Sequence, residues 1–259
     1  MPRPVLIIRT GRAPDPIRAR HGDFPHWFRL ATGVARDRLL VVDVAVGEAL
    51  PKATEVAGAL ITGSAAMVTE RAGWSERTAG WIRDAMDHAL PMFGVCYGHQ
   101  LMAHALGGRV DYLPGGREIG TMAIERLPGA ADDPLVASLP QSFRAHTTHE
   151  QSVLEAPAGA QVMARSARDP HHLLRYGPHA LSVQFHPEFN AEVMRAYIHR
   201  KRHDVRREGA NPDSIFRAVA PTPWARQLLR RFAQQHRLSD TPAASTPKRE
   251  SLPGTGRQR

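Results

Sequence analysis

Short apolar runs alternate with stretches of helical periodicity through residue 106. The runs are apolar at consecutive positions rather than at every second one, which predicts strands buried on both faces. Apolar residues spaced three and four apart predict the helices between them. The expected strands are 5–9, 39–46, 59–62 and 92–95, and the expected helices are 24–35, 75–89 (capped by Ser75) and 97–106. This alternation favours a mostly parallel sheet covered by helices on both sides.

The pattern changes after residue 118, where strand-like segments follow one another with little helix between them. These segments are 119–126, 143–147, 161–166, 173–176 and 180–185, and we expect them to form an antiparallel extension. Two helices, 191–208 and 224–237, then close the domain. Residues 238–259 have no periodicity and no aromatic side chain, which predicts a disordered tail after one domain over 1–237.

Composition narrows the class of protein. The chain has 259 residues, 42% of them hydrophobic and 23% charged, as in a globular protein with a substantial core. Its single cysteine excludes an internal disulfide and any multi-cysteine metal cluster, which fits a reducing compartment. No apolar run has membrane-spanning length, and the N-terminus lacks the pattern of a secretory signal, so we expect a cytoplasmic protein.

The net charge of +9 is weak evidence for a nucleic-acid ligand. Only three of the 34 basic residues are lysine, and much of the charge lies in two segments, 195–207 and 237–259, that water can solvate. Such charge supports nonspecific association with polyanions. We therefore expect no specific nucleic-acid site.

The most informative segment surrounds Cys96, in the sequence GVCYGHQ over 94–100. A buried strand ends and a helix begins there, with Gly94 and Gly98 two residues to either side, as in a nucleophile elbow. Helix N-termini favour a thiolate, and the N–H of Tyr97 is placed to stabilise an oxyanion. The alternative, a buried structural thiol, is less consistent with this context.

A thiol nucleophile needs a base, and the strand over 180–185 runs directly into His186, Pro187 and Glu188. Pro187 ends the strand, so His186 projects at the carboxyl edge where ligands bind in open α/β sheets. Glu188 can orient one imidazole nitrogen while the other faces the thiol. At the same edge, the N–H groups of Gly63 or Ser64 could supply a second oxyanion donor.

No metal or cofactor is expected. His199 and His203 are spaced i, i+4 on a predicted helix, but no third ligand accompanies them. The pair His149-Glu150 lacks the second histidine of a zinc-protease motif, and there is no phosphate-binding glycine loop.

Four segments together resemble the class I glutamine amidotransferases, and above all proteins related to the amidotransferase domain of GMP synthase. They are 63–64 (GS), 94–108 (GVCYGHQLMAHALGG), 148–153 (THEQSV) and 182–188 (SVQFHPE). The resemblance implies a flavodoxin-like α/β/α sandwich that hydrolyses the side-chain amide of L-glutamine. It implies Cys96 as nucleophile, His186 as general base and acid, and Glu188 as orienting carboxylate.

The resemblance also implies a set of substrate-contacting positions, namely Gly63, Ser64, Tyr97, Gln100, Thr148, His149, Glu150 and Gln151. Two departures concern these positions. The family's turn with two glycines and a proline is Gly63-Ser64-Ala65 here, and its usual Ser-His-Gly-Asp is Thr148-His149-Glu150-Gln151. The changes leave the thiol chemistry in place and bear on which γ-glutamyl amide is bound.

Three functional hypotheses remain open from the sequence. The protein could be a glutaminase-type subunit that passes ammonia to a separate synthase, docked through the basic helix over 195–207. It could be a free-standing hydrolase of other γ-glutamyl amides or peptides. The third hypothesis, a catalytically silent binding protein, has only the basic charge in its favour.

Overall fold

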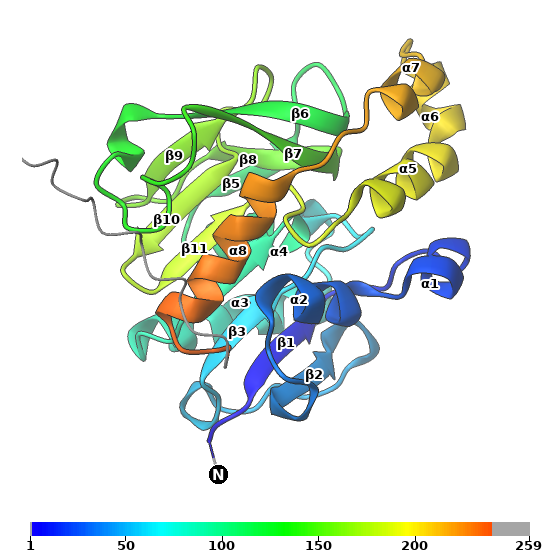
Figure 1. The fold of residues 1–259 in the computed structure, drawn as a ribbon. Coiled ribbons are helices and arrows are strands. Elements are labelled where there is room, and N and C mark those ends of the chain that lie inside the picture. The colour runs from blue at the N-terminus through cyan, green and yellow to red at the C-terminus, as the bar shows by residue number, and fades with distance from the viewer. Residues whose placement is uncertain (1, 240–259) are drawn as a thin grey trace, which may run out of the picture.

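A nine-stranded sheet forms the centre of the molecule in a computed structural model, which describes residues 2–239 (Figure 1). The strand order is β2-β1-β3-β4-β11-β10-β9-β6-β7. The first five strands in this order run parallel, and the remaining pairs are antiparallel. Their bounds are β1 Val5–Arg9, β2 Leu39–Asp43, β3 Gly58–Ile61, β4 Met92–Val95, β6 Glu118–Arg126, β7 Ser142–His149, β9 Gln161–Arg165, β10 Leu173–Gly177 and β11 Ala180–Val183. A small antiparallel sheet pairs β5 (Arg109–Tyr112) with β8 (Gln151–Glu155).

Helices cover both faces of the parallel part. Side chains of β1 alternate between two cores: Val5 and Ile7 belong to one, Leu6 and Ile8 to the other. The first core includes side chains of α2 (Phe24–Thr32) and α8 (Pro223–Gln235), and the second those of α3 (Gly73–Asp87) and α4 (Tyr97–Ala105). Both faces of the strand are therefore buried, which explains its unbroken apolar run. This is the three-layer α/β/α sandwich, with mostly parallel sheet and antiparallel extension, that the sequence predicts.

Four further helices lie beyond the sandwich. They are α1 (Asp15–His21), α5 (Ala191–Arg200), α6 (Arg202–Arg207) and α7 (Pro212–Arg217). Figure 1 shows α5, α6 and α7 in succession at one side of the molecule, on the same side as α1. The α1 and α5 segments contact each other, so they form a wall beside the carboxyl edge of the parallel strands.

Several predicted bounds need correction. The helix expected from Ser75 begins at Gly73 after Ala72, and Ser75 does not cap it; its hydroxyl bonds the Tyr97 hydroxyl at 2.7 Å. The apolar run over 39–46 is a strand only to Asp43, followed by a 3-10 turn. The helix over 191–208 is divided at Lys201, and the strand over 180–185 ends at Val183. The short elements α1, α7, β5 and β8 were not predicted, because each is too short to show a clear period.

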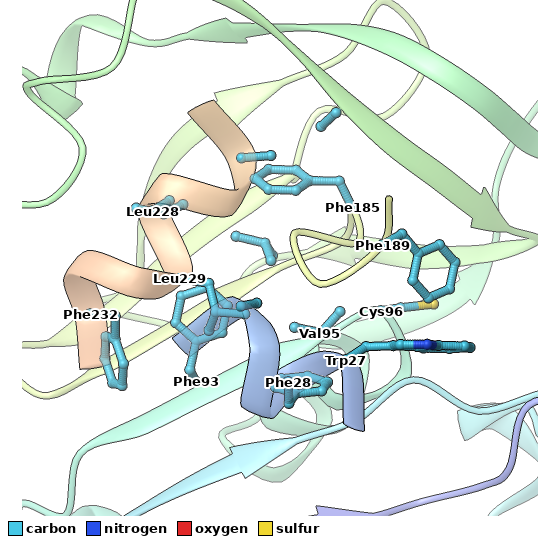
Figure 2. Close-up of a cluster of buried hydrophobic side chains, with 14 of the residues drawn as sticks. Trp27, Phe28, Phe93, Val95, Cys96, Phe185, Phe189, Leu228, Leu229 and Phe232 are labelled. Atoms are coloured by element: carbon cyan, nitrogen blue, oxygen red, sulfur yellow. The ribbon is translucent and has the colours of Figure 1, made fainter. Parts of the chain in front are cut away.

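The first core extends from α8 to the edge of the site (Figure 2). Leu228, Leu229 and Phe232 of α8 are fully buried in it, and Cys96 lies at its edge. Leu238 also belongs to this core. It and Ser239 are the described part of the predicted tail, both are buried, and residues 240–259 lie outside the described chain. Within 2–239, no helix has the length and apolar character required to cross a bilayer.

Candidate active site

Cys96 lies on the sharp bend between β4 and α4. Its φ of 53° and ψ of −104° are unfavourable for a residue with a Cβ atom, so the bend holds strain. A Cβ at position 94 would come within 2.6 Å of the Gly98 oxygen, and one at position 98 within 2.6 Å of the Ile61 oxygen. Glycine is required on both sides because the backbones are in contact there.

We expect Gly98→Ala to destabilise the protein by about 1–3 kcal/mol, because the added methyl meets a backbone oxygen that cannot move aside cheaply. Urea unfolding of the two proteins measures the change. Gly129→Ala is the matched control, since a Cβ there meets nothing within 4 Å. Equal midpoints for both variants would show that the bend tolerates side chains.

His186 is held beside Cys96 by the sheet itself. Strand β11 lies parallel to β4 with Val183 opposite Val95, and the Cys96 N–H donates to the Val183 oxygen at 2.9 Å. The His186 N–H donates to the His146 oxygen at 2.8 Å, and its Nδ1 lies 2.7 Å from Glu188 Oε1. Among residues 2–239, Nε2 has no hydrogen-bond partner, and His186 and Cys96 line the same cavity.

An aromatic side chain fixes the plane of this imidazole. The ring of Phe189 stacks on His186, with centroids 4.1 Å apart and planes within 14° of each other. Phe24 lies farther off, 6.4 Å from the His186 centroid. Figure 2 shows Phe189 and Cys96 within one cluster of buried side chains. Stacking prevents rotation of His186 away from Glu188, because the ring would then collide with its neighbours.

The electrostatics favour a thiolate–imidazolium pair. Burial is the largest influence on Cys96 and opposes its ionisation, but the charge and hydrogen bond of His186, together with the charge of His149, outweigh it, so the thiol pKa lies below its ordinary value. Burial likewise opposes the charge on His186, but Glu188 and the Cys96 thiolate raise its pKa. His186 and Glu188 are each about 2% exposed, so water screens this pair little.

Gly63 lies next to both reactive side chains. A Cβ on it would lie 3.0 Å from His186 Cε1 and 3.6 Å from Cys96 Cβ. The N–H of Tyr97 belongs to the first turn of α4, where backbone donors lack partners within the helix. The Tyr97 side chain points elsewhere, with its hydroxyl on Ser75 and its ring against Trp74. Only its backbone can therefore serve the site.

A cavity of about 210 Å³ opens at the thiol. Ser64 and Thr148, two of the predicted substrate-contacting residues, line it, and the buried Thr148 hydroxyl has no hydrogen-bond partner within 2–239. Residues of the loop before α1 and of α5 and α6 complete the wall, among them Arg12, Pro14, Tyr197, Arg200, Lys201 and Asp204. Three of these carry a positive charge and one a negative charge. The cavity is suited to a small polar ligand that carries a negative group.

The side chains of the other predicted contact residues point away from the cavity. The Gln100 amide donates to the Gln151 oxygen at 2.7 Å and to Gln184 at 3.0 Å. The Gln151 amide donates to Thr69 at 2.6 Å. His149 bonds Glu118, and Glu150 pairs with Arg117 at 2.7 Å and Lys201 at 3.5 Å. Apart from Glu150, which lies at the boundary, these side chains support the walls of the site.

One buried cluster has the composition of a cation site. Ligand atoms of Glu118, His149, Asp169 and His172 lie within 4.8 Å of one another. Both histidines direct Nε2 to Glu118 Oε2, at 3.0 and 2.8 Å, and Asp169 accepts from the Ser152 hydroxyl. These are hydrogen-bond contacts, so we assign a polar network here. His199 and His203, predicted on one helix, are in α5 and α6 respectively.

Sequence reasoning missed this network and the wall formed by α5 and α6. Glu118 begins a strand in the sequence REIG, and nothing nearby marks it as a partner of His149. Their proximity comes from the register of β6 with β7, in which Glu118 is opposite His149. Lys201 belongs to the basic segment 195–207, and such segments are usually exposed to solvent, so the sequence did not indicate that Lys201 lines a cavity. Phe189 was also missed, although its position directly after Glu188 could have indicated an aromatic side chain beside His186.

Fold and site define an α/β protein with a cysteine at a strand-to-helix bend and a histidine–glutamate pair in the segment that follows the adjacent strand. The chain belongs to the class-I glutamine amidotransferase family, whose model matches residues 39–204. It is 37% identical over 131 residues to GMP synthase (glutamine-hydrolyzing) of Thermomicrobium roseum, covering 51% of this chain and 23% of that protein. It is 28% identical over 129 residues to gamma-glutamyl peptidase 5 of Arabidopsis thaliana, covering 49% and 51%.

The fold is shared with solved structures. A glutamine amidotransferase from Thermotoga maritima superposes with a TM-score of 0.72 at 19% identity, covering 91% of this chain and 99% of that one. The match covers about a quarter of the GMP synthase and about half of the peptidase. Membership of this family implies hydrolase activity.

Proposed function

We propose that the protein is a cysteine-dependent amidohydrolase that cleaves the γ-amide of L-glutamine to glutamate and ammonia. The observation that carries this proposal is the Cys96–His186–Glu188 arrangement at the mouth of one cavity. A nucleophile, a base within its reach and a carboxylate that orients the base are the parts that acyl transfer requires.

In the first half of the reaction, the Cys96 thiolate attacks the γ-carbonyl carbon and a C–S bond forms. The N–H groups of Tyr97 and of Gly63 or Ser64 hold the negative oxygen that results. Collapse of this intermediate breaks the C–N bond, and His186 gives its Nε2 proton to the departing amine, which leaves as ammonia. A γ-glutamyl thioester remains on Cys96.

In the second half, His186 removes a proton from water, which attacks the thioester carbonyl. The C–S bond breaks, glutamate leaves, and the Cys96 thiolate is restored. Glu188 keeps the His186 Nδ1 proton in place throughout, so that Nε2 alone exchanges protons. Phe189 covers the imidazole and limits access of bulk water.

The test is an assay of glutamate and ammonia release by the purified chain, with mass spectrometry of acid-quenched samples. We expect release of both products and a covalent γ-glutamyl adduct on Cys96, the only thiol in the chain. Absence of turnover and of an adduct with glutamine and with every γ-glutamyl amide tried would overturn the proposal.

We expect a bell-shaped pH dependence of kcat/KM. The active form carries a Cys96 thiolate and a His186 imidazolium, so activity rises as the pH passes the lowered pKa of Cys96. It falls again as the pH passes the raised pKa of His186, because the amine then loses its proton donor. The two apparent values belong to the coupled pair. A profile with no basic limb would contradict the role of His186 as acid.

A second candidate function is hydrolysis of γ-glutamyl peptides, and two observations favour it. Arg200 lines the cavity and suits a carboxylate on the departing group, whereas the neighbouring Arg12 pairs with Asp43 and Lys201 with Glu150. Glu150, where a glycine is usual in the GMP synthase type, pairs with Lys201 at the same wall. Comparing kcat/KM for glutamine, γ-glutamylglycine and its uncharged C-terminal amide separates the candidates. A preference for free γ-glutamylglycine over both others identifies a peptidase.

The glutamine-cleaving function would call for an ammonia acceptor. The matched part of the Thermomicrobium roseum enzyme is 23% of that protein. We propose that a separate synthase receives the ammonia, docked beside the basic segment of α5 and α6. Co-purification with a synthase that stimulates glutamine hydrolysis would support this pairing. High uncoupled turnover of peptides with no partner would count against it.

A further inference from the structure

The ring of His149 faces two hydrogen-bond acceptors in the interior. Nδ1 lies 2.9 Å from the backbone oxygen of Gln151, and Nε2 lies 3.0 Å from Glu118 Oε2. His149 is only 4% exposed, so water competes little for either nitrogen. A carbonyl oxygen can only accept, and an ionised carboxylate can only accept. Both nitrogens must therefore carry a proton, which makes the ring an imidazolium.

Glu118 is held in its ionised form. Besides His149, its Oε2 faces His172 Nε2 at 2.8 Å, and its Oε1 accepts from the Ser166 hydroxyl at 2.6 Å. Burial opposes the charge, but these three donors outweigh it and keep the pKa of Glu118 far below its ordinary value. Because three donors stabilise its ionised form, Glu118 stays negative. Its charge balances the positive charge of His149.

The same ring is tied to the nucleophile. The Gln151 oxygen that accepts from His149 also accepts from the side chain of Gln100, at 2.7 Å. Gln100 lies in the first turn of α4, and its backbone N–H donates to the Cys96 oxygen at 3.0 Å. Thr148, adjacent in sequence, lines the cavity with Cys96. The Gln151 carbonyl oxygen therefore connects the His149 ring to Gln100 of α4, the helix that begins next to Cys96.

We propose that His149 is a positioning residue that carries a permanent positive charge, fixed by Glu118, and stabilises the Cys96 thiolate together with His186. Glu118 on β6 and Asp169 and His172 from the β9–β10 segment cluster with it, and Cys96 and His99 at the α4 end interact with its charge. The effect of this charge on catalysis rests on the proposed function of Cys96 as nucleophile. Its effect on the pKa of the Cys96 thiol does not depend on that function.

The balance of charges around His149 supports this assignment. Burial opposes the charge on the ring, but Glu118, Asp169 and the Cys96 thiolate together raise its pKa. The Cys96 pKa, in turn, is lowered by His149 after His186. His99, equally buried nearby, differs: burial lowers its pKa to about 3, and it bonds a serine hydroxyl rather than a carboxylate. His99 is therefore neutral where His149 is charged.

The decisive measurement is the pH dependence of Cys96 alkylation by iodoacetamide in the full chain. Because Cys96 is the only thiol, the reaction reports its ionisation whether or not any substrate is hydrolysed. We expect His149→Gln to move the midpoint upward by about one pH unit. We expect His99→Gln, which removes an uncharged imidazole of similar burial, to leave it unchanged. Equal midpoints in wild type and His149→Gln would overturn the proposal.

Three further readouts support the test, and two of them use the wild-type protein. In ¹⁵N-labelled wild-type protein, both His149 ring nitrogens should remain protonated from pH 6 to pH 9, and a neutral ring would overturn the assignment. Glu118→Gln should release the proton of His149 and raise the Cys96 midpoint in the same direction. Elemental analysis provides a final check. One tightly held metal ion per chain, lost in Glu118→Gln, would contradict an imidazolium, because the metal would occupy the Nε2 lone pair.

Discussion

Cys96→Ala is expected to reduce amide hydrolysis by at least about 10⁴-fold while the protein stays folded. No other thiol is available to take over the attack on the carbonyl. The fold survives because alanine nearly matches cysteine in size and keeps the Cβ atom at this bend. The measurements are kcat/KM with the best γ-glutamyl substrate and the thermal unfolding midpoint of both proteins.

The same variant separates chemistry from binding. Because the cavity walls are unchanged, Cys96→Ala should still bind glutamine or γ-glutamylglycine in calorimetry, without forming an adduct. Stoichiometric alkylation of the wild-type thiol should remove activity to the same extent. Full activity in alkylated protein, or in the alanine variant, would mean that another group is the nucleophile.

Glu188→Gln is expected to have the second largest effect, lowering kcat by roughly 10³-fold with little change in KM. The carboxylate lies 2.7 Å from His186 Nδ1 and stabilises the imidazolium. A neutral amide can present its N–H to Nδ1 and favour the wrong tautomer, with the proton on the nitrogen that must act as base. The pKa of His186 should fall as well, since Glu188 is the largest influence that raises it.

The pH profile checks the second of these effects. In Glu188→Gln the basic limb of kcat/KM should move to lower pH, because the imidazolium loses its counter-charge. Glu192→Gln is the matched control: it removes the same charge four residues away, from a side chain that is 65% exposed in α5. Equal losses in both variants would point to net charge and not to orientation of His186.

The parts of the site that the sequence predicts are those whose residues lie close together along the chain. The strand–GxCxG–helix bend is encoded within five residues, and the structure places Cys96 at φ 53° between two obligatory glycines. His186 and Glu188 are also local to each other, so their 2.7 Å contact follows from a two-residue spacing. These features could be read without any knowledge of the tertiary fold.

Features set by pairing between distant segments could not be read in this way. Glu118 meets His149 only because β6 and β7 pair in one register. Lys201 reaches Glu150 because the basic helix is divided there, which brings a side chain from a solvated run to the cavity wall. The side chains of Gln100 and Gln151 have partners that the sequence does not reveal, for the same reason. Their amides find partners on other strands and loops.

The pairing of β4 with β11 separates two tasks that could otherwise interfere. Val95 and Val183 are opposite each other in the centre of the sheet, so hydrogen bonds within the core set the separation of thiol and imidazole. The cavity wall comes instead from peripheral helices, with Tyr197 and Arg200 from α5 and Asp204 from α6. Replacements in those helices can alter which compound is admitted while the bond-breaking apparatus stays intact. Such a division allows a lineage to acquire new substrates by small surface changes, without rebuilding its chemistry.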